Sequence, residues 1–186
     1  MKRACLIAAF VLLAACRVER AASGRPPGTR TAADSLTAGE QDSSEAVAVE
    51  AALRTYYRRF SSRHWRDFGL SFWPGAIITT NWQPPGEGAE RVVAQSVDDF
   101  VSRAADGPDR LAVFSEDLVH VDVRTYGPLA EAWAIYRARF GTRRDSVETQ
   151  YGIDAFHLMK HRGEWRITAL TFTNEVPGRP LAVRRP

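Results

Sequence analysis

The sequence predicts an α+β fold in which helices lie against one face of a strongly bent antiparallel sheet. Two observations carry this prediction. Helical patterns are confined to the part of the chain before about residue 105, and strand-like segments joined by tight turns fill most of the rest up to residue 176. Helices and strands that segregate along a chain are typical of α+β architecture, in which helices pack on one face of a meander.

The first sixteen residues have the pattern of an export signal. Lys2 and Arg3 precede an apolar run from Ala4 to Ala15, which is shorter than the ~20 residues that a spanning helix needs. Residues 1–15 are therefore predicted to be a signal peptide. The closing Leu13-Ala14-Ala15-Cys16 resembles the lipobox of bacterial lipoproteins. The resemblance implies cleavage before Cys16 and a diacylglyceryl group on its thiol, which would hold the protein on a membrane of the cell envelope, facing the periplasm or the exterior.

The composition of the remaining chain excludes several functions. Both cysteines, Cys5 and Cys16, lie in the export segment, so the domain has no thiol for a disulfide, a zinc-thiolate site or a cysteine nucleophile. Without Lys2 and Arg3 the formal net charge falls from +3 to +1, and no basic stripe with interleaved aromatics is present, which argues against nucleic acid as a partner. No phosphate loop, dinucleotide fingerprint or metal-ligand spacing appears, so we expect neither a cofactor nor a metal.

Residues 16–44 are predicted to form a flexible tether that begins at the lipidated cysteine. From residue 17 to residue 44 the chain has no aromatic side chain and is rich in Ala, Ser, Gly, Thr and Pro, so it cannot bury enough apolar surface to offset its chain entropy. As a coil it would span about 30 Å, enough to hold a domain clear of lipid headgroups.

Order is predicted to begin near residue 45 with an amphipathic helix. Asp42, Ser43 or Ser44 can cap its free N–H groups, and an apolar stripe follows at helical spacing. The stripe consists of Val49, Leu53, Tyr56 and Phe60. Because aromatic residues at this spacing belong more often to a core than to a cofactor site, we expect the stripe to pack on the sheet.

Shorter elements are predicted after this helix. His64–Phe68 favours a second helix that ends near Gly69, and Ala76–Trp82 favours a strand rich in Ile and Thr. Residues 84–88 read as a surface loop, and Ser96–Asp99 forms a capping box before a helix over residues 100–105. The later strands are predicted over residues 111–114, 118–124, 130–140, 147–160 and 165–174, with a flexible tail over residues 177–186.

Several local motifs resemble one superfamily. They are Tyr56-Tyr57 in the first helix, Trp65–Phe68, the entry Phe72-Trp73-Pro74-Gly75-Ala76, and above all the hairpin Gly163-Glu164-Trp165-Arg166-Ile167. Together they are similar to the nuclear transport factor 2-like proteins, which include polyketide cyclase-like (SnoaL-like) and ketosteroid isomerase-like members. The resemblance covers residues 45–176. It implies a cone-shaped barrel of curved antiparallel sheet wrapped on two to three N-terminal helices, a scaffold shared by enzymes, binding modules and assembly domains.

Asp154 is the first candidate for chemistry inside such a cone. It alternates onto the same face as Phe156 and Leu158, and a tight hairpin would place it opposite Thr171. The resemblance implies an Asp or His base beside a Tyr or a second acid, so in an enzyme of this kind Asp154 would be the base, with Tyr136 or a histidine assisting. Loss of solvent around Asp154 would raise its pKa and make it a general base or acid. The alternative is a structural or surface carboxylate.

Further candidates could bind a ligand without reacting with it. Trp73, Trp82 and Trp133 could form the aromatic walls of an apolar pocket, although core packing explains them equally well. His120 and Asp122 share one face of a strand, where the carboxylate could orient the imidazole. Because Val119, Val121 and Val123 occupy the other face, the alternative is that the valines pack inward and the polar pair faces solvent.

The strand around Trp133 is apolar on both faces, as expected if a second copy of the chain covers the sheet. A homodimer through the sheet is therefore one predicted partner arrangement, beside the membrane lipid attached at Cys16. Three functions stay open at this point. One is a lipid-anchored domain that binds a small apolar ligand or a protein partner without catalysis, and another is an isomerase, cyclase or hydratase with Asp154 as its base. The third is a purely structural or assembly role.

Overall fold

The computed structural model describes residues 32–82 and 89–183 of the chain, with side chains described from residue 42. The predicted signal peptide, Cys16, the first part of the predicted tether and the loop at 84–88 lie outside these residues. In the part that is described, no helix is both long enough and apolar enough to cross a membrane.

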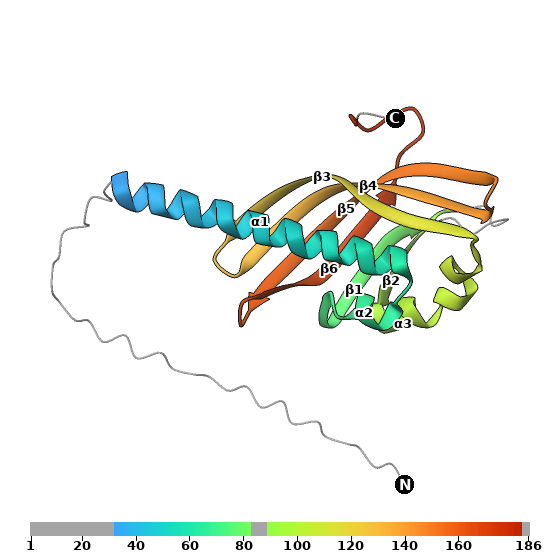
Figure 1. The fold of residues 1–186 in the computed structure, drawn as a ribbon, viewed down its shortest axis with the longest axis horizontal. Coiled ribbons are helices and arrows are strands. Elements are labelled where there is room, and N and C mark those ends of the chain that lie inside the picture. The colour runs from blue at the N-terminus through green and yellow to red at the C-terminus, as the bar shows by residue number, and fades with distance from the viewer. Residues whose placement is uncertain (1–31, 83–88, 184–186) are drawn as a thin grey trace, which may run out of the picture.

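Six strands form one curved sheet (Figure 1). Their bounds are β1 Phe72–Trp82, β2 Arg91–Ser96, β3 Val113–Tyr126, β4 Leu129–Arg143, β5 Ser146–His161 and β6 Glu164–Asn174. The order across the sheet is β2-β1-β6-β5-β4-β3. The meander predicted for the second half of the chain is confirmed, and the fold is α+β.

The sheet differs from the expected antiparallel barrel in two ways. β1 runs parallel to β6, while all the other neighbours are antiparallel, so the sheet is mixed. β2 and β3 are its two edges and do not pair with each other, so the sheet is open. The reason is topological: β1 lies beside the last strand, and the chain then continues through β2 at one edge before it returns to β3 at the other.

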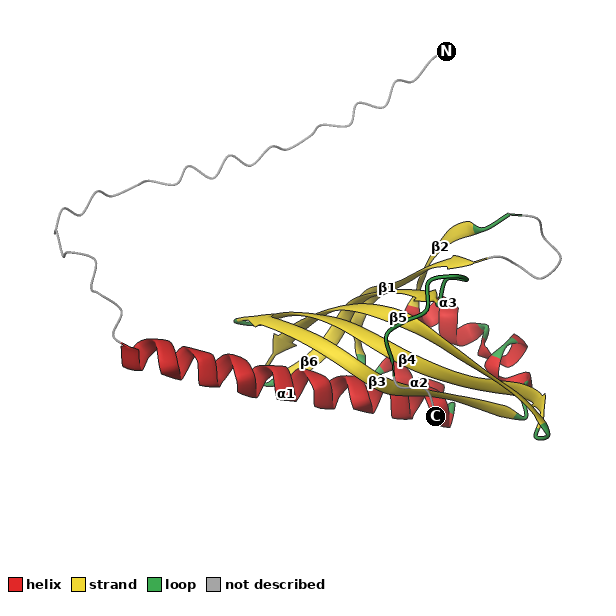
Figure 2. Cartoon of the chain, turned by 90° about the horizontal axis from the view of Figure 1, so that it is seen from above, coloured by secondary structure: helices red, strands yellow, loops and turns green. Residues whose placement is uncertain are grey.

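The long helix α1 (Ala32–Ser62) lies along one face of the sheet (Figures 1 and 2). All four residues of the predicted apolar stripe are buried. The helix begins at Ala32, however, so residues 32–44 are helical and do not belong to a flexible tether. The cap predicted at Asp42, Ser43 or Ser44 is therefore wrong, because these residues lie inside the helix. Once the second half of α1 is docked, each residue added toward the N-terminus extends an existing helix at little cost. This first part projects beyond the ends of the strands, on the side of the β3–β4 and β5–β6 turns (Figure 1).

Shorter helices cover the end of the sheet near β1. α2 (Trp65–Gly69) forms where it was predicted, and α3 (Val97–Ser102) starts three residues earlier than expected. The predicted cap is confirmed, because Ser96 Oγ accepts a hydrogen bond from the Asp99 N–H at 3.0 Å. Two 3-10 turns follow, Ala104–Asp106 and Pro108–Arg110. The edge strand β2 was not predicted from the sequence.

An aromatic cluster fills the space between α1 and the sheet. The Tyr56 ring lies 5.3 Å from Phe68 and 5.2 Å from Phe156, and the Phe60 ring lies 5.2 Å from Phe68. These packed rings supply much of the apolar burial that fixes α1 on the sheet. Farther along the helix, Lys160 Nζ lies 2.6 Å from Glu45 Oε1, and this ion pair ties α1 to β5.

Two β-bulges decide which side chains point toward α1. In β3, Leu118 pairs with Tyr136 and His120 with Ile135, so Val119 is the extra residue. In β6, Ile167 pairs with Leu158 and Ala169 with His157, so Thr168 is the extra residue. Each bulge reverses the alternation of inward and outward side chains along its strand.

Past β6, the predicted flexible tail is partly ordered in the structure. Val176 forms an isolated bridge with Arg179, and the N–H of Leu181 donates to Glu175 Oε1 at 2.7 Å. These contacts fold the segment back on itself.

Candidate functional site

A cavity of about 220 Å³ lies between the aromatic cluster and the sheet, and we call it the helix–sheet cavity. Its walls are mostly aromatic and aliphatic, with two carboxyl groups and one phenol. The lining residues are Tyr56, Phe60, Phe68, Ile78, Phe100, Pro108, Glu116, Tyr136, Asp154, Leu170 and Phe172. Most of these residues are buried, whereas Phe100, Pro108, Glu116 and Phe172 are half-exposed. The cavity therefore reaches the surface beside α3 and the 3-10 turns.

Asp154 lies on the inner face of β5, where the predicted alternation with Phe156 and Leu158 is confirmed. Only 3% of the residue is exposed, and Tyr57 donates its hydroxyl to Asp154 Oδ2 at 2.6 Å. Burial raises the pKa of Asp154 to about 7, because the carboxylate loses its hydration, and the hydrogen bond from Tyr57 partly opposes this rise. Asp154 can therefore both hold and release a proton near neutral pH.

The cross-strand partner predicted for Asp154 is wrong. Asp154 pairs with Phe172, and Thr171 pairs with Ala155. The bulge at Thr168 shifts the register by one residue between the hairpin and this point, so Phe172 takes the inward position. Thr171 is exposed and does not line the cavity.

Tyr57 completes the environment of Asp154 from α1. It lies one helical turn after Leu53, and it is 3% exposed. Burial, followed by the nearby charge of Asp154, raises its pKa well above the ordinary value, so its hydroxyl stays protonated and acts as a donor. The helix α1 thus supplies both one wall of the cavity and the hydroxyl donor that orients the carboxyl group of Asp154.

Glu116 is a second carboxyl group in the same cavity, and sequence reasoning missed it. Unbroken alternation would place Glu116 on the outer face with His120 and Asp122, but the bulge at Val119 turns it inward. Its backbone is fixed against α1, because Ser61 Oγ donates to Glu116 O at 2.8 Å and accepts from Glu116 N at 2.8 Å. Burial, and then the charge of Asp154, raises the pKa of Glu116 well above its usual value.

Tyr136 crosses the floor of the cavity from β4. Its ring lies over Gly152 on β5, where an added Cβ would collide with the phenol, so only glycine leaves room for it. The Tyr136 hydroxyl donates to Asn174 Oδ1 on β6 at 2.9 Å. Burial raises its pKa, so Tyr136 is a neutral hydrogen-bonding group at neutral pH.

The arrangement can carry acid–base chemistry or hold a polar group of a ligand. Asp154 has a pKa close to neutrality, and Glu116 stays protonated to a higher pH than an ordinary carboxyl group. A proton acceptor and a proton donor thus lie in one apolar space, the setting in which acid–base and hydrogen-bonding interactions are strongest.

The predicted tryptophans lie elsewhere. Trp73 is half-buried outside the cavity, where its Nε1 donates to Met159 O at 2.9 Å and the Arg166 guanidinium stacks 4.9 Å from its ring. Trp82 ends β1, and its side chain lies outside the described residues. Trp133 is 56% exposed on the outer face of the sheet.

His120 and Asp122 also face outward, as the alternative interpretation predicted. Their atoms Nε2 and Oδ1 lie 3.3 Å apart, with 59% and 75% of the side chains exposed. Asp122 and Trp133 line an open groove of about 670 Å³ on this face, together with His157. In the described part of the chain, no group of three or more His, Cys, Asp or Glu side chains is arranged to hold a metal ion.

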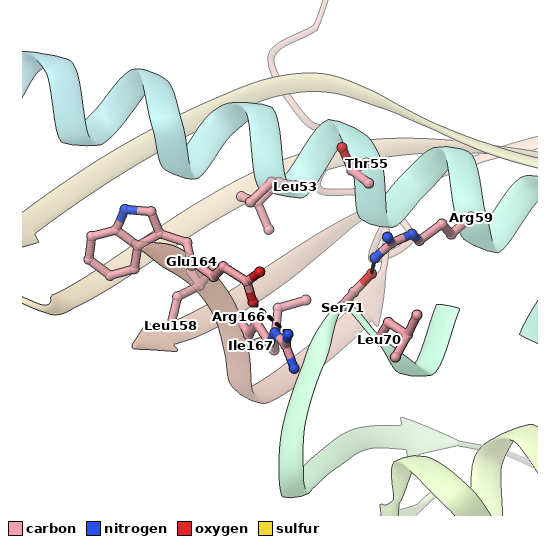
Figure 3. A pocket seen from close by; sticks show the side chains of 11 residues that line it. Leu53, Thr55, Arg59, Leu70, Ser71, Leu158, Glu164, Arg166 and Ile167 are labelled. Carbon is pink, nitrogen blue, oxygen red and sulfur yellow. Dashed lines mark hydrogen bonds and ion pairs between the residues drawn. The ribbon is translucent and has the colours of Figure 1, made fainter. Parts of the chain in front are cut away.

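A larger hollow, of about 430 Å³, lies between α1, the α2–β1 connection and the start of β6 (Figure 3). Four of its polar side chains are engaged with one another: Arg59 donates to Ser71 Oγ at 3.1 Å, and Arg166 pairs with Glu164 at 2.5 Å. No predicted site residue lines it. The helix–sheet cavity, although smaller, contains the groups with perturbed pKa values and is the better candidate site.

Comparison with solved structures identifies the architecture. A protein of unknown function from Mycobacterium tuberculosis matches with a TM-score of 0.60 and 14% identity, over 74% of this chain and 75% of that one. A nuclear transport factor 2-like superfamily protein from Salmonella enterica matches with a TM-score of 0.58 and 13% identity, over 73% and 94%. The chain has the nuclear transport factor 2-like fold.

A ketosteroid isomerase-like protein from Erwinia carotovora has the same fold, with a TM-score of 0.54 and 15% identity over 72% of this chain and 98% of that chain. No family model matches the sequence, and no curated protein does. At these identities the nuclear transport factor 2-like fold is shown and the activity is not. Function must be argued from the site itself.

Proposed function

We propose that the chain is a lipid-anchored protein of the bacterial cell envelope whose nuclear transport factor 2-like domain binds a small, mostly apolar molecule. The observation that carries the binding proposal is the helix–sheet cavity, an apolar space with Asp154 and Glu116 among its lining. Concave apolar sites with a few convergent polar groups are typical of small-molecule binding. The anchor rests on the sequence pattern that ends at Cys16.

The cavity volume limits the size of the ligand. An engineered apolar cavity of about 150 Å³ holds benzene, and pockets for drug-sized molecules run from about 300 to 1,000 Å³. At about 220 Å³, the helix–sheet cavity fits one substituted ring or a short branched chain. A steroid or another fused polycycle would require the walls to move.

A second candidate function is proton transfer on such a molecule, in an isomerase or dehydratase reaction. It is favoured by the hydrogen bond from Tyr57 to Asp154 and by the pKa of about 7 for that carboxyl group. Asp154 would remove a proton from carbon, and the protonated carboxyl of Glu116 would donate a hydrogen bond to the oxygen that gains charge. Both functions place the ligand in the same cavity.

Native mass spectrometry of the protein purified from its own host tests the binding proposal. A retained small molecule of one-ring size, lost when the cavity is filled by Leu170→Trp, supports it. A protein that emerges empty and whose cavity resonances do not respond to any single-ring compound contradicts it. Asp154→Asn then separates the two functions, because a binder should keep its ligand whereas an enzyme should lose turnover while still binding.

The anchor is tested separately by membrane fractionation of the Cys16→Ala variant. Loss of the lipid should move the protein from the membrane fraction to the soluble fraction, because a single apolar signal of this length does not span a bilayer. A variant that remains with the membranes would contradict lipidation as the anchor, and it would leave the cavity proposal unaffected.

A further inference from the structure

The side chains lining the helix–sheet cavity include acidic groups and no basic ones. Two of its lining residues carry carboxyl groups, Asp154 and Glu116, and none of the lining residues is Lys, Arg or His. Tyr57 donates to one oxygen of Asp154. Among the described residues, no other side chain donates a hydrogen bond to Asp154, and none donates to the carboxyl group of Glu116. Carboxyl oxygens therefore face the cavity as free acceptors.

The walls around these acceptors are unusually aromatic. Six of the lining residues carry rings, namely Tyr56, Phe60, Phe68, Phe100, Tyr136 and Phe172. Neighbouring rings contact each other at several orientations; for example, Phe68 and Phe100 lie 5.9 Å apart at 39°. The face of an aromatic ring carries partial negative charge, which attracts a cation. Rings and carboxyl groups thus favour the same kind of ligand.

We propose that the helix–sheet cavity takes a protonated primary amine on a single-ring or short apolar stem, with the ammonium between Asp154 and Glu116 and the stem among the phenylalanines. This inference rests on the proposed binding function and specifies its ligand class. An ammonium group has three N–H donors and no acceptor, which matches a site of free carboxyl oxygens. An anionic ligand would face like charge with no cation to offset it.

A neutral ligand is the alternative, and the energetics of the empty site distinguish the two. Two neighbouring carboxyl groups resist ionisation in an apolar space because each charge is poorly hydrated and repels the other. A bound cation supplies the missing opposite charge, so both groups can ionise on binding, whereas a neutral alcohol or ketone supplies none. The charge-assisted hydrogen bonds then formed favour the amine over an alcohol of the same shape by about 10- to 100-fold.

Binding of the amine should also depend on pH. The titratable groups that face Asp154 are Tyr56 and Tyr57 from α1, Glu116 from β3 and Tyr136 from β4. Asp117, which follows Glu116 in the chain, is paired with Arg137 at the surface. The buried tyrosines stay neutral, since their pKa values are raised. Between pH 6 and 8 Asp154, whose pKa is about 7, loses its proton while an alkylammonium keeps its charge, so amine affinity should rise.

The test is a titration of the purified full chain with three probes of one shape: benzylamine, benzyl alcohol and benzoate, followed by NMR or calorimetry at pH 6 and pH 8. We expect benzylamine to bind at least 10-fold more tightly than benzyl alcohol, more tightly at pH 8 than at pH 6, and benzoate not to bind. Asp154→Asn and, independently, Glu116→Gln should each weaken benzylamine binding about 10-fold or more. Asp67→Asn, an exposed residue of α2, is the matched control and should change nothing.

Benzyl alcohol binding as tightly as benzylamine, or benzylamine affinity that falls as the pH rises, would overturn the amine inference. Either result would leave the proposed small-molecule function intact, since a ligand would still occupy the cavity. If Asp154→Asn does not fold, the Glu116→Gln variant and the pH series of the unmodified protein still decide the question. If none of the probes binds, the amine inference fails, and retention of another molecule in native mass spectrometry decides the proposed function.

Discussion

Replacing Asp154 by Asn should remove a pH-dependent destabilisation of the folded protein. Burial raises the pKa of Asp154 to about 7, whereas an Asp in the unfolded chain titrates near 3.9. At low pH both states hold the proton and the carboxyl group costs nothing. As the pH rises from 4 to 7, the unfolded state releases its proton first, so the free energy of unfolding falls. A difference of about three pKa units corresponds to about 4 kcal/mol.

Urea denaturation at pH 4.5 and pH 8 measures this effect. The stability of Asp154→Asn relative to the unmodified protein should increase by about 3 kcal/mol between these two pH values, because part of the titration is already complete at pH 4.5. With a urea dependence of about 2 kcal/mol per molar, the midpoint difference should grow by about 1.5 M. Asn keeps an acceptor for the Tyr57 hydroxyl, so the comparison isolates the charge. The exposed control Asp67→Asn should show no such trend.

A difference between variant and unmodified protein that is the same at both pH values would refute this reasoning, since it would mean that Asp154 ionises as it does in the unfolded chain. Glu116 must be separated from this effect, because removal of the Asp154 charge also lowers the pKa of Glu116. The variant Glu116→Gln and the double variant complete a cycle that apportions the pH dependence between the two groups. A coupling that vanishes would show that they do not share the cavity.

Gly152→Ala should lower the free energy of unfolding by about 1–3 kcal/mol in urea denaturation, because the new methyl group collides with the Tyr136 phenol. The control Gly69→Ala, at a position with open space around it, should lower the free energy of unfolding by less than about 1 kcal/mol. Tyr57→Phe should raise the pKa of Asp154 above 7 in an NMR titration of its carboxyl carbon, since the hydroxyl hydrogen bond lowers that pKa; an unchanged value would refute the contact. Trp133→Glu should shift sedimentation from dimer to monomer if the outer face pairs two copies, and an unmodified protein that sediments as a monomer would refute that arrangement.

The sequence was sufficient to place Asp154 on the inner face of the sheet, because β5 alternates without interruption around this residue. Hydrophobic neighbours at i+2 and i+4 report the inner face as long as the strand keeps its two-residue period. The same rule placed the valines of β3 inward correctly at Val121 and Val123, and it failed at Val119, which is 40% exposed. A bulge has no strong sequence signature, so the reversal of the alternation is visible only in the structure.

Glu116 was not identified as a site residue for this reason, and Tyr57 was not identified for a different one. Tyr57 lies beside the apolar stripe of α1 at helical spacing, so its burial could be predicted from the sequence. Its hydrogen-bond partner on β5, Asp154, is 97 residues away along the chain. No local pattern identifies a contact at that separation. The parallel pairing of β1 with β6 and the edge strand β2 were likewise decided by packing between distant segments, whereas the Ser96 cap and the hairpin near Gly163 are local and were predictable.

The cost of the carboxyl pair argues that it serves a ligand. Domains of this size are stable by only about 5–15 kcal/mol, so a penalty of about 4 kcal/mol at Asp154 is a large share of the total. Replacing buried charged groups by well-packed apolar residues is often neutral or stabilising, so fold stability alone does not require carboxyl groups at these positions. Tyr57 offsets only part of the penalty, because its hydrogen bond engages one oxygen of Asp154. A bound molecule that satisfies the remaining oxygens would recover the rest, which is the physical reason for our proposal that the helix–sheet cavity is more stable when it is occupied.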